Sequence, residues 1–167
     1  MSQEYGKDPP LSYNKYLKVP ELISLQETLS EPPSHDELLF IIIHQTYELW
    51  FKQVLHEIDA SIQWIGQGRM FRANHSLKAL TTIEKILVTQ IHLLETMAQI
   101  GFLEFRDKLN PASGFQSMQF RELEFVSGAK DETILETFRH DEFAYQRLSE
   151  RFAEPSLADA FWSLLEK

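Results

Sequence analysis

Apolar residues recur along the chain at helical spacing, and no segment shows sustained strand alternation. The string LLFIII at 38–43 is apolar on all sides, which implies burial on all sides. It continues as a stripe of apolar positions at Trp50, Val54, Ile58 and Ile62. The pattern therefore predicts a helix over about 35–65 that ends at Gly66. Ser34 and Glu37 have the spacing of a capping box, in which each side chain accepts a hydrogen bond from the other's backbone amide.

A second long helix is predicted over about 70–100, ended by Gly101. Its apolar positions fall near three- and four-residue spacing: Leu77, Leu80, Leu87, Ile91, Leu94 and Ala98. Shorter helices are predicted at 20–29, 103–109, 116–126, 131–139, 141–152 and 156–166, with a loop at 110–114. The chain is therefore expected to be all-α, a helical bundle built on two long antiparallel helices with shorter C-terminal helices. Residues 1–12 are expected to form a flexible N-terminal arm, and residues 13–167 a single domain.

Composition narrows the class of protein. The 167 residues include no cysteine, which excludes a disulfide scaffold, a thiolate metal site and a cysteine nucleophile. The formal net charge of −9 disfavours nucleic-acid binding, which needs clustered lysine and arginine. The polar N-terminus has no apolar signal region, and the longest apolar run is far shorter than a membrane span. We therefore expect a cytoplasmic protein with neither a nucleic-acid nor a membrane partner.

His44 is the first candidate for chemistry, because it lies in the apolar part of the first long helix, one turn after Phe40. A buried imidazole beside a phenyl ring can hold a flat heteroaromatic ligand and accept a proton or a hydrogen bond from it. The alternative is a core histidine bonded to Glu48 or to a backbone carbonyl. Spacing alone leaves both interpretations open.

Arg106 follows Phe102 and Phe105, and an arginine flanked by aromatic residues can clamp a carboxylate through two hydrogen bonds. The alternative is an ion pair with Asp107 or another acid on a helix surface. The loop at 111–117 can present backbone amides to a ligand, or it can simply connect two helices. No histidine pair has the spacing of a known metal motif, so no metal site built from side chains is predicted.

Three strings, in this order, resemble the haem-dependent tryptophan 2,3-dioxygenase family: YNKYL at 13–17, HDELLFIIIHQTYELWFKQVLHEID at 35–59 and FRDKLNPASGFQSMQFRELE at 105–124. The resemblance runs from about residue 10 to the C-terminal end. It implies an all-α homotetramer that opens the indole ring of L-tryptophan with O2 at haem b. The implied product is N-formylkynurenine, in the first step of tryptophan catabolism through kynurenine.

The resemblance also implies roles for individual residues. His44 matches the distal histidine that hydrogen-bonds the indole nitrogen, and Phe40 matches the phenylalanine that packs on the indole and the haem. Phe102 matches an aromatic wall of the substrate site, and Arg106 matches the arginine that clamps the substrate carboxylate. The neighbouring positions assigned to substrate binding are Ile41, Ile42 and Ile43.

Two further segments have implied roles. Ser113 and Gly114 match the loop over the haem edge. Tyr13, Tyr16 and Leu17 match the arm that reaches into the pocket of a neighbouring subunit. An aromatic pair of this kind can also simply pack against a partner subunit.

The proximal haem histidine of the family is expected beyond residue 167, so no metal ligand is predicted in this chain and the isolated chain is expected to be inactive. Two alternatives to an enzyme stay open. One is a truncated, non-catalytic paralogue that binds an indole or an aromatic amino acid. The other is a helical module that mediates self-association.

Overall fold

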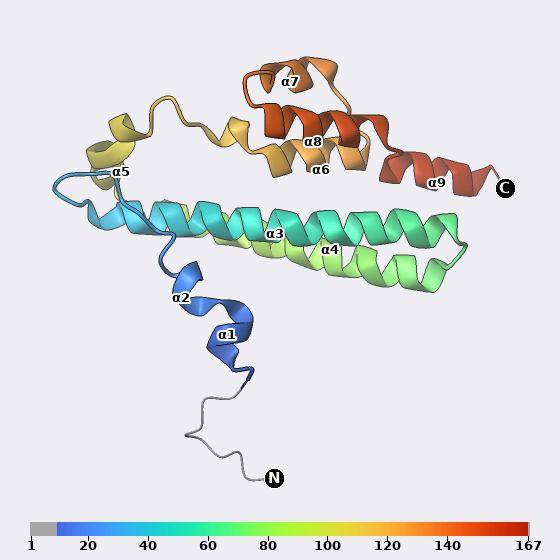
Figure 1. The fold of residues 1–167 in the computed structure, drawn as a ribbon, viewed down its shortest axis with the longest axis horizontal. Helices are drawn as coiled ribbons and strands as arrows, with labels where there is room; N and C mark the ends of the chain where they lie inside the picture. Colours follow the sequence, from blue (N-terminus) through green and yellow to red (C-terminus); the bar gives the residue numbers. More distant parts are fainter. Residues whose placement is uncertain (1–9, 167) are drawn as a thin grey trace, which may run out of the picture.

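The computed structural model describes residues 10–166, and every regular element in that range is helical. The two longest helices, α3 (His35–Gly66) and α4 (Met70–Gln90), run antiparallel and side by side (Figure 1). Gly68, at φ +70°, lies in the turn between them, in a conformation that glycine adopts without strain. The predicted all-α bundle on two long antiparallel helices is confirmed.

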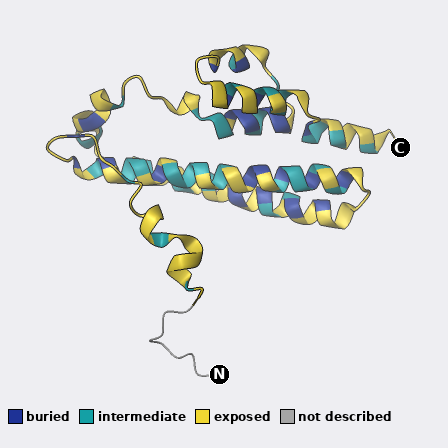
Figure 2. Ribbon diagram, in the orientation of Figure 1, coloured by how far each residue is buried: buried dark blue, intermediate teal, exposed yellow. Residues whose placement is uncertain are grey.

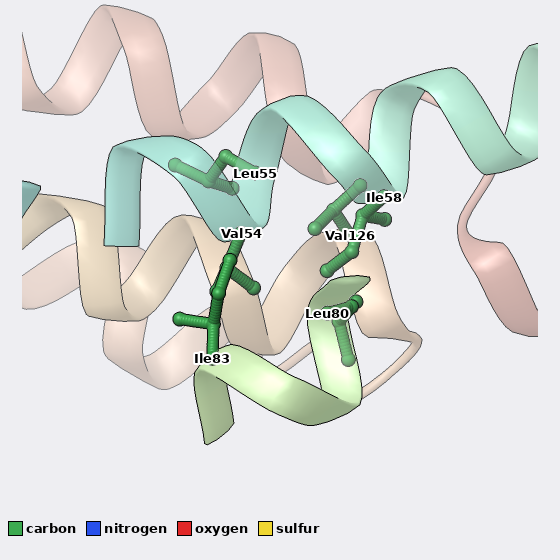
Figure 3. Close-up of a cluster of buried hydrophobic side chains, with 6 residues drawn as sticks. All are labelled: Val54, Leu55, Ile58, Leu80, Ile83 and Val126. Atoms are coloured by element: carbon green, nitrogen blue, oxygen red, sulfur yellow. The ribbon is translucent and has the colours of Figure 1, made fainter. Parts of the chain in front are cut away.

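A cluster of aliphatic side chains joins α3 and α4 to a third helix, α6 (Met118–Ser127). Figure 3 shows its six buried members: Val54, Leu55, Ile58, Leu80, Ile83 and Val126. Trp50 and Ile62, from the predicted stripe, pack against this cluster. Full burial of one such aliphatic side chain contributes about 1.5–3 kcal/mol relative to exposure. The cluster therefore fixes α6 against the two long helices.

The C-terminal helices cover one side of α3 (Figure 1). They are α6, α7 (Glu132–Thr137), α8 (Glu142–Ala153) and α9 (Leu157–Leu165). Each begins after a serine or aspartate whose side chain accepts from a first-turn amide: Ser117, Asp131, Asp141 and Ser156. The predicted helices at 116–126, 131–139, 141–152 and 156–166 are confirmed, with small shifts at their ends.

Arg151 of α8 ties this layer to α3. Its guanidinium donates to both carboxylate oxygens of Asp59, at 2.8 and 2.6 Å, and lies 3.4 Å from the buried carboxylate of Glu122. The hydrogen bonds to Asp59 raise the pKa of Arg151 above its ordinary value, so the pair stays ionised. A bidentate pair of this kind sets the geometry between two elements.

The predicted helix over 70–100 is correct as far as Gln90 and wrong beyond it. After α4 ends, Ile91–Thr96 forms a 3-10 helix, η1, and Met97 and Ala98 then take extended backbone conformations. Helix α5 (Gln99–Arg106) follows, and the chain direction changes by 91°. The turn brings α5 across the beginning of α3, where Phe105 is fully buried.

Helix α5 replaces the predicted helix at 103–109, whose last residues form the 3-10 turn η2 (Asp107–Leu109). Within residues 10–166, no single helix is long and apolar enough to cross a membrane. The bent pair of Met70–Thr96 and Gln99–Leu109 meets that criterion by length and composition only.

The predicted helix at 20–29 forms only over its first residues, in α2 (Val19–Leu22), where Pro20 lies in the first turn as expected. Another short helix, α1 (Tyr13–Leu17), precedes α2, and Lys18 at φ +50° separates the two. Residues 24–30 are irregular, and the Gln45 side chain on α3 donates to the Leu25 carbonyl at 2.9 Å. Helices α1 and α2 stand away from the bundle and bury none of their side chains (Figure 2). The expected arm at 1–12 lies mostly outside the described residues.

The predicted capping box at Ser34 is not formed, because Glu37 has better partners. Its buried carboxylate accepts from the backbone amides of Leu29 and Ser30, at 2.6 and 3.0 Å, and from the Ser30 hydroxyl. Ser34 instead donates its hydroxyl to the Gly101 carbonyl, at 3.4 Å. Glu37 therefore attaches Leu29 and Ser30 to the beginning of α3.

Candidate functional site

Two adjoining cavities lie where α3, η1 and α5 meet. The histidine cavity, of about 370 Å³, is lined by Ile43, His44, Tyr47, Glu48, Phe51, Ile91, Leu94, Ser113, Gly114, Phe115, Ser117, Phe120 and Arg121. The arginine cavity, of about 490 Å³, is lined by Phe40, Leu94, Met97, Ala98, Gln99, Phe102, Leu103 and Arg106. The two share Leu94 as a wall. The sequence-predicted residues His44 and Arg106 therefore belong to neighbouring cavities.

His44 stacks on Phe40, with ring centroids 4.1 Å apart. Its Nδ1 lies 2.7 Å from the Phe40 carbonyl oxygen. Because a carbonyl oxygen only accepts, Nδ1 carries the proton in this contact. In a neutral imidazole Nε2 is then left as a hydrogen-bond acceptor.

The prediction that His44 is buried is wrong, because its side chain is exposed at the cavity mouth. Glu48, the alternative partner, bonds Ser117 and Gln119 instead, at 2.6 and 2.8 Å. The backbone-carbonyl partner that the sequence left open is the one observed. This bond lies within α3, and it orients the ring while Nε2 stays available to a ligand.

Three phenyl rings hold α5 against α3. Phe40 contacts Phe102 and Phe105, with centroid separations of 5.8 and 5.4 Å. Phe102 and Phe105 meet edge to face at 5.4 Å. Since Phe105 is fully buried, this cluster fixes the last turn of α5, and Phe40 and Phe102 become walls of the arginine cavity.

Arg106 ends α5 with an exposed side chain that lines the arginine cavity. Most other arginines of the described chain pair with carboxylates: Arg121, Arg139, Arg147 and Arg151. The remaining two, Arg69 and Arg72, lie over the ring of Trp64. Within residues 10–166, Arg106 has no such partner, and the ion pair with Asp107 is not formed. Its guanidinium is therefore available to a carboxylate ligand.

Of the isoleucines assigned to substrate binding, Ile43 alone lines either of the two adjoining cavities; it is buried and lines the histidine cavity. Ile43 and the exposed Ile42 also line a groove of about 910 Å³ between α3 and α4, and Ile41 lines none of these three. The predicted burial of residues 38–43 on all sides is therefore wrong, because α4 and α5 cover only part of this turn.

Ser113 and Gly114 lie at the start of a 3-10 turn, η3 (Gly114–Gln116), on the far wall of the histidine cavity. The Ser113 side chain accepts from the Phe115 amide at 3.3 Å, and the Ser113 amide donates to Gln116. A Cβ atom at Gly114 would meet no protein atom within 4 Å, so the bare backbone borders open space. With the apolar walls Ile43 and Phe51, this suits the face or edge of a flat macrocycle such as haem.

Tyr47 and Phe51 complete the wall that α3 contributes to the histidine cavity. Neither was identified as a site residue from the sequence. Their spacing from His44 is the signal that could have found them, because residues three, four and seven positions apart share a helix face. The Tyr47 hydroxyl donates to the Leu87 carbonyl at 2.7 Å, and burial raises its pKa. Tyr47 therefore stays neutral and links α3 to α4 behind the cavity.

Tyr13, Tyr16 and Leu17 line neither cavity. They lie on α1 with exposed fractions of 75%, 72% and 44%. A single copy of the chain therefore does not bring them to the site. Within residues 10–166, no three histidine, aspartate or glutamate side chains are grouped to hold a metal ion.

Comparison with known proteins gives one consistent result. Residues 2–167 match the sequence model of a family described as tryptophan 2,3-dioxygenase. Similar curated proteins of that name occur in Nocardioides sp. (strain ATCC BAA-499 / JS614), with 54% identity over 93% of this chain and 60% of the relative. Those of Herpetosiphon aurantiacus and Aedes aegypti are 49% and 41% identical, over 93% and 99% of this chain and 60% and 46% of the relative. The chain spans about 60% of the length of the first two of these relatives.

Proposed function

Because this chain belongs to the tryptophan 2,3-dioxygenase family, we propose that it forms the substrate side of a haem-dependent site that opens the indole ring of L-tryptophan with O2. The product would be N-formylkynurenine. One observation supports the proposal most strongly. The acceptor nitrogen of His44 and the guanidinium of Arg106, which has no carboxylate partner among the described residues, line adjoining cavities that have aromatic walls.

His44 receives the indole in this proposal. Since Nδ1 is bonded to the Phe40 carbonyl, Nε2 accepts the indole N–H, and it can hold that proton if the reaction releases it. Phe40 and Phe102 would flank the flat ring by aromatic contact. A ligand with a ring but no N–H donor would leave this nitrogen without a partner.

Arg106 receives the substrate carboxylate. Its two terminal nitrogens can bond both oxygens in parallel, and this fixes the amino-acid end of the substrate as well as its charge. Together with His44, it would hold L-tryptophan at two points and place the indole ring relative to O2. A two-point site of this kind discriminates against indole itself, which lacks the carboxylate.

Haem b is the cofactor that we propose for the histidine cavity. Ile43, Phe51 and Gly114 would face the macrocycle, and Ser113 would lie at its edge. Bound haem iron would supply the activation of O2. Among the described histidines, His44 alone lines either cavity, and it is assigned to the substrate. We therefore expect the isolated chain to bind ligands without turning them over.

A second copy of the chain completes the proposed assembly as a homo-oligomer, a tetramer as in the family. The exposed Tyr13, Tyr16 and Leu17 would cover the site of that copy and exclude water from it. Exposed aromatic side chains on a projecting element support this arrangement, since most of the surface of Tyr13 and Tyr16 stays exposed within one chain.

The proposal is tested by titrating the purified chain with haem and following the Soret band, with and without L-tryptophan. We expect saturable uptake of haem and a further spectral change when L-tryptophan is added. A Soret band that L-tryptophan leaves unchanged at saturating haem would overturn the assignment of the two cavities to one haem-and-substrate site.

A further inference from the structure

Glu48 lies one helical turn beyond His44 and bonds across the histidine cavity to the N-terminal end of α6. One carboxylate oxygen accepts from the Ser117 hydroxyl at 2.6 Å, and the other accepts from the Gln119 side-chain amide at 2.8 Å. The same amide donates to the Glu48 backbone carbonyl at 2.9 Å. Both donors are neutral, so the negative charge is held by hydrogen bonds alone within the described residues.

The direction of these bonds is fixed by the cap of α6. The Ser117 oxygen accepts from the Phe120 amide at 3.1 Å, which leaves its own hydrogen for Glu48. Ser117 also ends η3, so it is the junction between the 3-10 turn and α6. Glu48 therefore holds this junction at a defined place along α3.

The segment held by Glu48 forms the far wall of the histidine cavity through Ser113, Gly114 and Phe115. Across residues 10–166, every hydrogen bond between residues 110–119 and α3 ends on Glu48. Arg121, which donates to the Phe115 carbonyl at 3.3 Å, ties the loop only to α6 itself. Within the described residues, the hydrogen-bonded link between this wall and α3 therefore consists of Glu48 alone, through two bonds to its carboxylate and one to its backbone carbonyl.

We infer that Glu48 is a positioning residue, which sets the width of the histidine cavity by fixing the 113–117 loop relative to His44. This inference rests on the proposed function, because it assumes that the cavity receives flat ligands. Glu48 acts through the loop, whose Ser113 and Gly114 would border the haem in the proposed function. Loss of the tie should therefore weaken the binding of haem.

Hydrogen–deuterium exchange of the purified chain tests the tie without any ligand. In Glu48→Gln, which presents an amide donor to the Gln119 donor, we expect the amides of 113–120 to exchange about tenfold faster. Gln119→Ala removes two of the three bonds, keeps the Ser117 cap and its bond to Glu48, and should change the exchange in the same direction if Glu48→Gln fails to fold. The matched control is Glu57→Gln, because Glu57 lies on the same helix and accepts from Gln53 at 2.9 Å. Unchanged exchange at 113–120 in both test variants would overturn the inference.

Haem affinity tests the positioning role itself. We expect Glu48→Gln to raise the dissociation constant of haem by about tenfold, and Glu57→Gln to leave it unchanged. The double variant Glu48→Gln/Gln119→Glu restores a donor–acceptor pair and should recover part of the affinity, which general destabilisation would not produce. Faster exchange with unchanged haem affinity would overturn the role. If the wild-type chain does not bind haem, the proposed function fails, whereas the exchange experiment still decides whether Glu48 fixes the loop.

Discussion

At the scale of single residues, His44 and Arg106 share one property. Each side chain keeps a hydrogen-bonding group, Nε2 of His44 and the guanidinium of Arg106, without a partner among the described residues. The His44 ring is fixed from behind by the Phe40 carbonyl, and Arg106 is carried on a turn that the buried Phe105 anchors. Most other arginines of the described chain pair with carboxylates. Substitution of either residue should therefore affect ligands far more than stability.

His44→Ala should weaken the binding of indole and of L-tryptophan by about tenfold, because the hydrogen bond between the indole N–H and the imidazole is lost. Since the side chain is exposed and bonds only within α3, the melting temperature should stay within a few degrees of wild type. Calorimetric titration and thermal unfolding measure the two quantities. Global unfolding of the variant would show instead that His44 is a structural residue.

Arg106→Leu should raise the dissociation constant of L-tryptophan by about 10- to 100-fold, because a charge-assisted bidentate bond is lost. The dissociation constant of indole, which has no carboxylate, should change little. Arg139→Leu is the matched control, since Arg139 is an exposed arginine paired with Glu136 away from both cavities. Equal weakening of tryptophan and indole would contradict the clamp.

At the scale of elements, the site depends on how α5 and the segment at 24–30 are attached to the beginning of α3. The attachment of this segment depends on Glu37. Burial raises the pKa of this carboxyl, but the hydrogen bonds from Leu29 and Ser30 outweigh it and leave the pKa below its ordinary value. Glu37 therefore stabilises the folded state as a carboxylate and loses that contribution on protonation.

Glu37→Gln should lower the free energy of unfolding by about 1–3 kcal/mol at neutral pH, because its amide presents donors to the donors of Leu29 and Ser30. A pKa lowered by folding gives stability above the unfolded value of about 4.3 that disappears as the pH falls through the folded value. The difference between wild type and variant should therefore be constant above about pH 5 and shrink below it. Urea unfolding between pH 7 and 3 measures it, and a difference that does not change with pH would refute the role of Glu37.

The helices themselves were predictable from the sequence, because apolar spacing and serine or aspartate caps are local signals. The break after Gln90 was not, since Leu87, Ile91 and Leu94 keep their spacing through the change from α to 3-10 geometry. The break coincides with a long-range hydrogen bond, in which the Gln90 side-chain amide donates to the Thr46 hydroxyl on α3. The capping box failed for the same reason, because the partners of Glu37 come from another segment.

The site was predictable only in part. The aromatic neighbour of His44 follows from helix geometry, but the meeting of His44 with Arg106 depends on the 91° turn before α5. The resemblance to a known family supplied that pairing, and local pattern did not. Glu48 was identified only as a possible partner of His44, and its bonds to Ser117 and Gln119 were not predicted because those residues lie at the start of another helix.

At the scale of the whole molecule, the described chain leaves a large apolar surface on the arm. Helices α1 and α2 project from the bundle, and the side chains of Tyr13 and Tyr16 are more than two-thirds exposed (Figure 2). Apolar groups gathered on a projecting element are typical of surfaces that pack against another chain. The proposed homo-oligomer would bury them.

Replacing Tyr13 and Tyr16 together by serine should weaken self-association, because two aromatic contacts are lost at the proposed interface. Sedimentation velocity over a range of concentrations measures the shift toward the single chain. Phe71→Ser is the control, since Phe71 is an exposed aromatic residue at the start of α4, outside the arm. An unchanged distribution in the double variant would argue against an interface through the arm.

In the proposed site, L-tryptophan binds at two points, through its indole nitrogen at His44 and its carboxylate at Arg106. Side-chain nitrogen NMR of the labelled chain, titrated with ligand, reports both points directly. We expect saturable shifts of the His44 and Arg106 resonances with L-tryptophan, and of the His44 resonance alone with indole. Two-point binding would be contradicted by L-tryptophan that shifts neither resonance, or by indole that shifts both equally.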